Sequence, residues 1–309
     1  MAKFFMFENK DAGRAYEQAL ASAGHEKYPR WTSMMRAGFG LIDHEHAGNR
    51  VKLLREFLNF GRPIFVYPHT PLAFFLWDGG VENLPVTCNF VAGDAARQSM
   101  RAYGYKSRTE AVGFSRCEVK SFSPTTGTKL LFVPARLRGG SGGYATKEYT
   151  ELTPRAFQFV LDHLKWFEKV TVCYTHDFID PVDYLTTGID FVFTNPNASP
   201  CPTADMLKYI DGADVVISCE TVGCLAVARG KPTIFYNTKS TPALSGRYIQ
   251  NYEKYRQWYQ FPLDLLDITI HDVLNLRKAA NPEIEQWKRG IIGGNFDTGK
   301  FLSIIREYV

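Results

Sequence analysis

The residues from 211 to 237, DGADVVISCETVGCLAVARGKPTIFYN, place polar groups directly after an apolar run. Val215-Val216-Ile217 is short and β-branched, which is typical of a central parallel strand, and helical spacing follows as far as Gly230. Thr233 to Tyr236 reads as the next strand. Because open α/β sheets bind ligands at the carboxyl ends of their strands, we expect a binding site in the turn. Its candidate residues are Ser218, Glu220, Thr221, Val222 and Gly223.

The chemistry that this turn favours is the binding of a nucleotide. The first amides of a helix have no partner within the helix and carry partial positive charge, so the amides of 221–223 can hold a phosphate. The carboxylate of Glu220 is suited to accept hydrogen bonds from two ribose hydroxyls. The alternative is that Glu220 is a residue at a helix start, stabilised by the helix dipole.

A second phosphate candidate is the stretch RLRGGSGG, which follows the expected strand Leu130 to Val133. It combines the guanidinium groups of Arg136 and Arg138 with a glycine backbone, Gly140 included, that can curl around an anion. The spacing is not that of a dinucleotide fingerprint, and a flexible surface loop is the alternative interpretation.

Candidate acid–base residues lie at the expected strand ends of both halves. His69 follows the strand 63–67, and His176 follows the strand 170–174. In a transfer reaction, which the family resemblance described below implies, His69 would deprotonate or position an acceptor, and His176 would offset the charge of a leaving diphosphate. Asp11 and Asp94 compete with His69 as the base, although carboxylates at these positions are equally good helix caps.

These residues must be positioned by two α/β domains, since 309 residues exceed one ordinary doubly wound sheet. Strands and helices alternate in each half, and the Ser-, Thr-, Pro- and Gly-rich stretch 121–128 is the best linker. We therefore expect an N-terminal domain over 1–125 and a C-terminal domain over 126–309, with the last helix packing back on the first domain.

Composition narrows the class of protein. Residues 1–125 carry 16 Lys/Arg against 12 Asp/Glu, so the whole excess of +4 lies there, and an acidic partner would meet this half; scattered solubilising charge is the alternative. The six cysteines show no metal or disulfide spacing, and Asp43-His44-Glu45-His46 reads as a polar loop. No stretch approaches the length of a signal peptide or a membrane span. The sequence predicts a cytoplasmic protein without a bound metal.

The stretch ADVVISCETVGCLAVARGKPTIFYN resembles the donor-binding motif of GT-B glycosyltransferases, and looks closest to CDP-glycerol and capsule polysaccharide transferases. The segments KLLFVPARLR, YTH, VYPH and FFMFENKDAGRAYEQALASAGHE resemble further parts of that family. The resemblance implies two Rossmann-like doubly wound domains facing a cleft, and a transferase of the EC 2.4 class. It implies a nucleotide-sugar donor, with UDP preferred, in the C-terminal domain, an acceptor in the N-terminal domain, and no cofactor.

The acceptor stays open between two substrate classes. The basic first half favours duplex DNA that carries a hydroxymethylated base, as in phage DNA-modifying glycosyltransferases, which resemble this fold. The closest motif likeness instead favours a cell-surface polymer or a lipid-linked acceptor. A sugar-nucleotide 2-epimerase and a catalytically silent binding module are the remaining alternatives.

Overall fold

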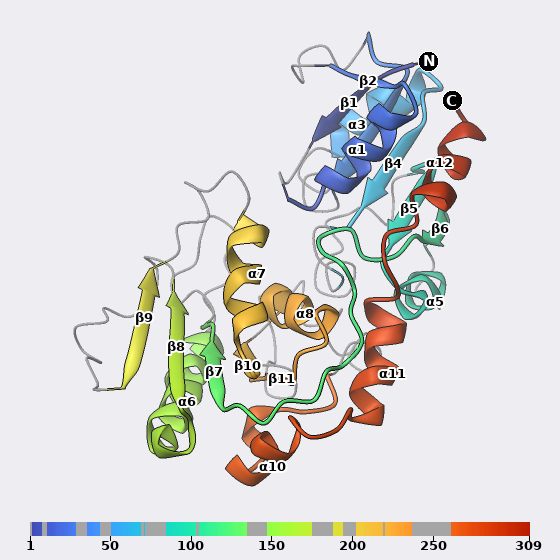
Figure 1. Cartoon of the computed structure of the whole chain (residues 1–309). Helices are drawn as coiled ribbons and strands as arrows, with labels where there is room; N and C mark the ends of the chain where they lie inside the picture. Colours follow the sequence, from blue (N-terminus) through green and yellow to red (C-terminus); the bar gives the residue numbers. More distant parts are fainter. Residues whose placement is uncertain are drawn as a thin grey trace. The chain divides into compact units, whose positions relative to one another are not determined.

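A computed structural model of the whole chain (Figure 1) describes residues 2–7, 11–28, 36–43, 51–68, 71, 85–102, 105–134, 147–174, 188–193, 202–218, 220–236 and 261–309. The chain forms two compact units. Unit 1 comprises Met1–Glu118 and Arg289–Val309, and unit 2 comprises Val119–Lys288. The chain thus passes into unit 2 a few residues before the boundary expected at 125, and its last part, which includes the final helix, belongs to unit 1.

Unit 1 contains a parallel six-stranded sheet in the order β2-β1-β3-β4-β5-β6. Its strands are β1 (Lys3–Phe7), β2 (Glu26–Lys27), β3 (Phe39–Asp43), β4 (Ile64–Tyr67), β5 (Cys88–Val91) and β6 (Arg108–Ala111). Its helices are α1 (Arg14–Ser22), α3 (Val51–Asn59), α5 (Asp94–Ala102) and α12 (Thr298–Arg306).

Helices cover both faces of this sheet. Phe4 and Met6 of β1 share a buried cluster with Tyr16 of α1 and Phe301 of α12. Because side chains alternate along a strand, Phe5 points to the other face, where its ring meets Phe57 of α3 at a centroid distance of 4.9 Å. The first domain is therefore the doubly wound α/β layer structure that the sequence predicts.

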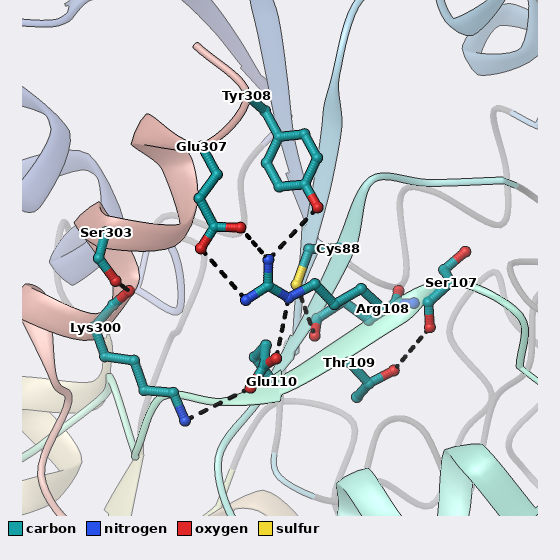
Figure 2. A network of polar contacts seen from close by, with 10 residues as sticks. Cys88, Ser107, Arg108, Thr109, Glu110, Lys300, Ser303, Glu307 and Tyr308 are labelled. Atoms are coloured by element: carbon teal, nitrogen blue, oxygen red, sulfur yellow. Dashed lines mark hydrogen bonds and ion pairs between the residues drawn. The ribbon is translucent and has the colours of Figure 1, made fainter.

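The C-terminal helix is fastened to the edge strand β6 by charged side chains (Figure 2). The guanidinium of Arg108 donates to Glu110 at 3.0 Å, to the hydroxyl of Tyr308 at 3.5 Å, and to Glu307. The ammonium of Lys300 lies 3.7 Å from Glu110. The hydrogen bonds to Glu307, Tyr308 and Glu110 raise the pKa of Arg108. Charges on an edge strand also oppose pairing with another chain.

Unit 2 contains a parallel five-stranded sheet in the order β11-β10-β7-β8-β9. Its strands are β7 (Lys129–Phe132), β8 (Lys169–Tyr174), β9 (Ile189–Phe193), β10 (Val215–Ser218) and β11 (Thr233–Phe235). Its helices are α6 (Lys147–Asp162), α7 (Pro202–Gly212), α8 (Glu220–Ala228), α10 (Ile270–Asn275) and α11 (Pro282–Ile291). Helix α11 continues into unit 1. Short 3-10 helices lie at Leu164–Trp166 and Leu265–Asp267.

Two pairs of helices enclose this second sheet (Figure 1). Phe132 and Ile217 belong to the face that α6 and α10 cover, through Phe157 and Val273. Helices α7 and α8 contact each other and the strands on the opposite face. Within the residues that the structure describes, no helix has the length and apolar character needed to cross a membrane.

The structure corrects several expected elements. The stretch 121–128 is packed within unit 2, because Arg277 donates to Thr126 and to Gly127, and the amide of Thr125 donates to Arg277. The strand β6 ends at Ala111, and Gly113, two residues later, takes a φ of 83°. Helix α11 was missed, although Asn281 accepts from the amides of Glu283 and Ile284 and so caps its start.

Candidate functional site

The sheet of unit 2 has a topological switch point between β7 and β10. The chain begins in the middle of this sheet with β7, adds β8 and β9 on one side, and returns to add β10 and β11 on the other. The connections that leave β7 and β10 therefore lead in opposite directions along the sheet. In open α/β sheets ligands bind in the crevice that opens at this place.

One side-chain and one backbone hydrogen bond fix the two strand ends at this switch point. The hydroxyl of Ser218, the last residue of β10, donates to the carbonyl of Val133 at 3.1 Å. The amide of Val133 in turn donates to the carbonyl of Ile217 at 2.9 Å. Ser218 is buried, and in this structure its hydroxyl holds the strand ends together; the contact with the donor that the sequence predicts for it stays a prediction.

Helix α8 starts directly after β10 and packs unusually close to the sheet. A Cβ added at Gly223 would lie 2.4 Å from the ring of Phe235 on β11, which is closer than side chains pack. The glycine therefore lets the helix approach the sheet, and from Gly223 to Ala228 its residues are buried. Close packing places the first turn of α8, with the half-buried Thr221 and Val222, at the switch point.

Of the groups predicted to bind phosphate at this place, the structure describes the backbone amides of 221–223. The amides of 221–223 belong to the first turn of α8, where amides carry partial positive charge and attract anions. The other predicted donor-binding groups lie outside the described residues. They are Arg136, Arg138, Gly140, His176 and the side chain of Glu220.

The Gly-Lys-Pro stretch lies at the amino end of β11, away from the ligand edge. Gly230 has a φ of 72°, and an added Cβ would lie 2.2 Å from the carbonyl oxygen of Ser121. The ammonium of Lys231 donates to the carbonyls of Asp211 and Ala213 at 2.8 Å, and burial lowers its pKa. These residues end α8 and hold the C-terminal end of α7, so their role is structural.

The sheet of unit 1 has its own switch point, between β1 and β3, and two buried carboxylates flank it. The chain places β2 on one side of β1 and continues with β3 on the other. Asp11 follows β1 and is 7% exposed, and Asp43, the last residue of β3, is fully buried. Burial of a charge is costly unless it is compensated, so two such groups at a ligand-binding edge mark a candidate site.

Asp94 has a different environment from Asp11. It begins α5 after β5, its side chain is 62% exposed, and it pairs with Arg97 one turn later at 3.0 Å. This geometry is that of a first-turn carboxylate stabilised by the helix dipole and a surface ion pair. His69, two residues after β4, lies outside the described residues.

The segment 113–118, which we call the crossing segment, runs from β6 along the carboxyl edge of unit 1. It passes Ala92 after β5 and Pro68 after β4, with which it lines a recess. It then reaches the loop after β1, where the hydroxyl of Ser115 donates to the carbonyl of Ala12 at 3.3 Å. The guanidinium of Arg116 lies 3.7 Å from the carboxylate of Asp11.

Sequence reasoning missed two of the groups at this edge. Asp43 was noted only as the start of a polar loop, although its place at the end of an apolar strand was a usable signal. Arg116 follows the edge strand β6, four strands away from β1, and no local pattern predicts that it meets Asp11. Among the described residues no group of three or more His, Cys, Asp or Glu could hold a metal ion.

Comparison with known proteins identifies the fold. No family model matches the chain, and no curated protein matches it. Solved structures that match include the putative UDP-N-acetylglucosamine 2-epimerase from Listeria monocytogenes, with 11% identity, a TM-score of 0.55, and coverage of 99% of this chain and 95% of that one. The calicheamicin glycosyltransferase CalG4 matches with 11% identity, a TM-score of 0.54, and coverage of 100% and 98%. At such identities the likeness shows the fold, two Rossmann-like units as in GT-B proteins.

Proposed function

We propose that this chain is a glycosyltransferase that takes its sugar from a nucleotide-sugar, with UDP as the preferred nucleotide. The observation that carries the proposal is the switch point of unit 2, where the glycine-packed start of α8 follows β10. The amides of 221–223 bind the diphosphate, and Glu220 accepts the ribose hydroxyls. Arg136, Arg138, Gly140 and His176 add further contacts to the diphosphate.

The transfer requires a nucleophile, a base and a stabilised leaving group. An acceptor hydroxyl oxygen forms a bond to the anomeric carbon, the bond from that carbon to the diphosphate oxygen breaks, and the diphosphate leaves with the electron pair. The proton of the hydroxyl passes to a base, for which His69, Asp11 and Asp94 are the candidates. The dipole of α8 offsets the charge that develops on the diphosphate.

For the acceptor we propose DNA that carries a hydroxymethylated base, on the evidence of charge. Unit 1 carries the whole net charge of +4, because unit 2 has 18 Lys/Arg and 18 Asp/Glu. Several of these cations are already paired in the structure, such as Lys27 with Glu17 and Lys3 with Glu26. Cations that are paired with carboxylates are less available to the phosphates of DNA. A cell-surface polymer or a lipid-linked acceptor is therefore the competing outcome of the test.

The testing experiment is a screen of UDP-, CDP- and GDP-sugars for nucleotide release, with and without DNA that contains hydroxymethylcytosine. Release of one nucleotide that rises sharply with the modified DNA supports both donor and acceptor. Slow release that is indifferent to DNA removes the DNA acceptor and keeps the transferase. If no nucleotide is bound or released, the proposed function is wrong.

A sugar-nucleotide 2-epimerase is the second candidate, and the buried carboxylates favour it. Epimerisation next to the anomeric carbon requires groups that remove and return a proton, and Asp11 and Asp43 are both buried at the carboxyl edge of unit 1. The discriminating observation is simple. An epimerase converts its nucleotide-sugar to a product with no acceptor present, and deuterium from the solvent enters the sugar, whereas a transferase shows neither.

A further inference from the structure

Arg116 is the charged residue among those that line the recess at the carboxyl edge of unit 1. The recess is lined by Pro68, Pro71, Ala92 and the residues 113–116 of the crossing segment. Among these lining residues Arg116 is the one that carries a charge, and its side chain is 10% exposed. A guanidinium at the carboxyl edge of a parallel sheet stands where such sheets bind ligands.

Asp11 forms an ion pair with this guanidinium. Its side chain is 4% exposed and thus more buried than that of Arg116, and the two charged groups are 3.7 Å apart. A buried ion pair contributes little net stability, because the loss of hydration of both charges offsets their attraction. It does hold the guanidinium in one place, which is what a binding residue requires from its neighbours.

The backbone around the pair supports this positioning. Ser115, next to Arg116, donates its hydroxyl to the carbonyl of Ala12, next to Asp11. One residue earlier in the crossing segment, the amide of Phe114 donates to the carbonyl of Gly294 at 2.9 Å. Arg116 therefore directly follows two residues that are hydrogen-bonded to other parts of unit 1.

We propose that Arg116 binds a phosphate group of the substrate, and that Asp11 orients it as a positioning residue. The inference rests on the proposed function, and it names a contact that the transfer uses. The planar fork of a guanidinium matches the oxygens of a phosphate. The phosphate has two sources, the diphosphate of the donor and a phosphate of the acceptor. In this role Asp11 takes no proton, which leaves His69 and Asp94 as candidate bases.

The test compares the Michaelis constants for donor and acceptor in Arg116→Gln, Arg116→Lys, Asp11→Asn and the double variant Asp11→Asn/Arg116→Gln. We expect Arg116→Gln to raise one Michaelis constant about ten- to hundredfold, as for a lost hydrogen bond to a charged group. The constant that rises identifies the source of the phosphate. Arg116→Lys keeps the charge and should recover part of the loss. Asp11→Asn should raise the same constant by less, and add nothing once Arg116 is replaced.

A matched control and a direct binding measurement separate failure of this inference from failure of the proposed function. Arg108→Gln removes another ion-paired arginine of unit 1 and should leave both constants unchanged. Inorganic pyrophosphate titrated calorimetrically should bind more weakly, or at fewer sites, in Arg116→Gln than in Arg108→Gln, even if no sugar nucleotide is turned over. The double variant removes both buried charges and thus serves if a single variant does not fold.

Three results would overturn the inference. The first is equal pyrophosphate binding in the two arginine variants. The second is that the effects of Asp11→Asn and Arg116→Gln on the Michaelis constants simply add. The third is that Asp11→Asn lowers kcat more than Arg116→Gln does, since Asp11 would then be the base itself.

Discussion

The close approach of α8 to the sheet predicts the effect of a single methyl group. In Gly223→Ala the new Cβ would lie 2.4, 2.6 and 2.9 Å from three atoms of the Phe235 ring, whereas ordinary contact begins at 3.4 Å. The ring must therefore move by about 1 Å, or the helix must. The ring has little room, because Phe261 lies at a centroid distance of 4.2 Å and Trp287 at 6.0 Å.

Two opposing contributions set the change in the free energy of unfolding caused by Gly223→Ala. Overpacking of a core costs about 1–3 kcal/mol, and the flanking rings favour the upper end of this range. Alanine in place of glycine in a helix returns about 1 kcal/mol, since the φ of Gly223 lies outside the left-handed region. The net loss is about 2 kcal/mol, which lowers the melting temperature of a unit of this size by about 4–8 °C.

The assay is calorimetric melting of the wild type, Gly223→Ala and the control Gly212→Ala, each with and without UDP. Gly212 ends α7 and has no atom within 4 Å of an added Cβ, so its substitution should be neutral or slightly stabilising. If α8 moves, its first turn moves too, and the stabilisation by UDP should shrink in Gly223→Ala alone. A Gly223→Ala protein that melts and responds to UDP like Gly212→Ala would refute the packing argument and the site built on it.

Three further predictions concern the charges and thiols. The carboxylate of Asp214 loses hydration on partial burial, which acts to raise its pKa, but it accepts from Thr125 at 2.6 Å and from the amide of Lys129 at 2.9 Å, and its pKa is lowered overall. Its stabilisation is thus present above about pH 4 and lost as the pH falls through the folded pKa. Asp214→Asn should therefore lower the free energy of unfolding by about 1 kcal/mol at pH 7, and this difference from the wild type should shrink as the pH falls below about 4. Arg108→Gln should release the end of α12 and speed amide exchange there, while Lys169→Gln, which loses an exposed pair with Asp190, should leave exchange unchanged. Burial raises the pKa of Cys88 and of Cys173 to about 12, so iodoacetamide at pH 8 should label the half-buried Cys117 in the native protein and spare these two until urea is added.

Local patterns of residues predicted the elements well and their long-range partners poorly. The run Val215-Val216-Ile217 is a buried central strand because it is β-branched and covered on both faces, and that information is contained in the run itself. The sequence analysis expected the last helix to pack on the first domain, but no pattern named its partners, since contacts such as that of Phe301 with Tyr16 join residues far apart in the chain. For the same reason the sequence did not predict that Arg116 meets Asp11.

The glycines show a related limit. The sequence indicated that Gly223 lies in the first turn of a helix at a ligand edge, where its amide can hold a phosphate, and gave no reason for a glycine at this position. The structure supplies the reason, the ring of Phe235 on β11, which lies after the helix in the chain. A glycine in a pattern shows that space is limited, but only the fold shows which atom limits it.

The two switch points offer different chemistry, and this difference bears on how a transfer would be divided between the units. At the switch point of unit 2 the described groups are helix amides, which suit a diphosphate that needs donors and no proton exchange. At that of unit 1 they are two buried carboxylates and a guanidinium, which suit a substrate that charged groups must orient. Gly223→Ala could slow nucleotide release by weakening the binding of UDP, while the Arg116 variants slow it only by raising the Michaelis constant for the acceptor. In that case the two units would bind separate substrates. If both variants weakened UDP binding, the phosphate at Arg116 would be the donor's own.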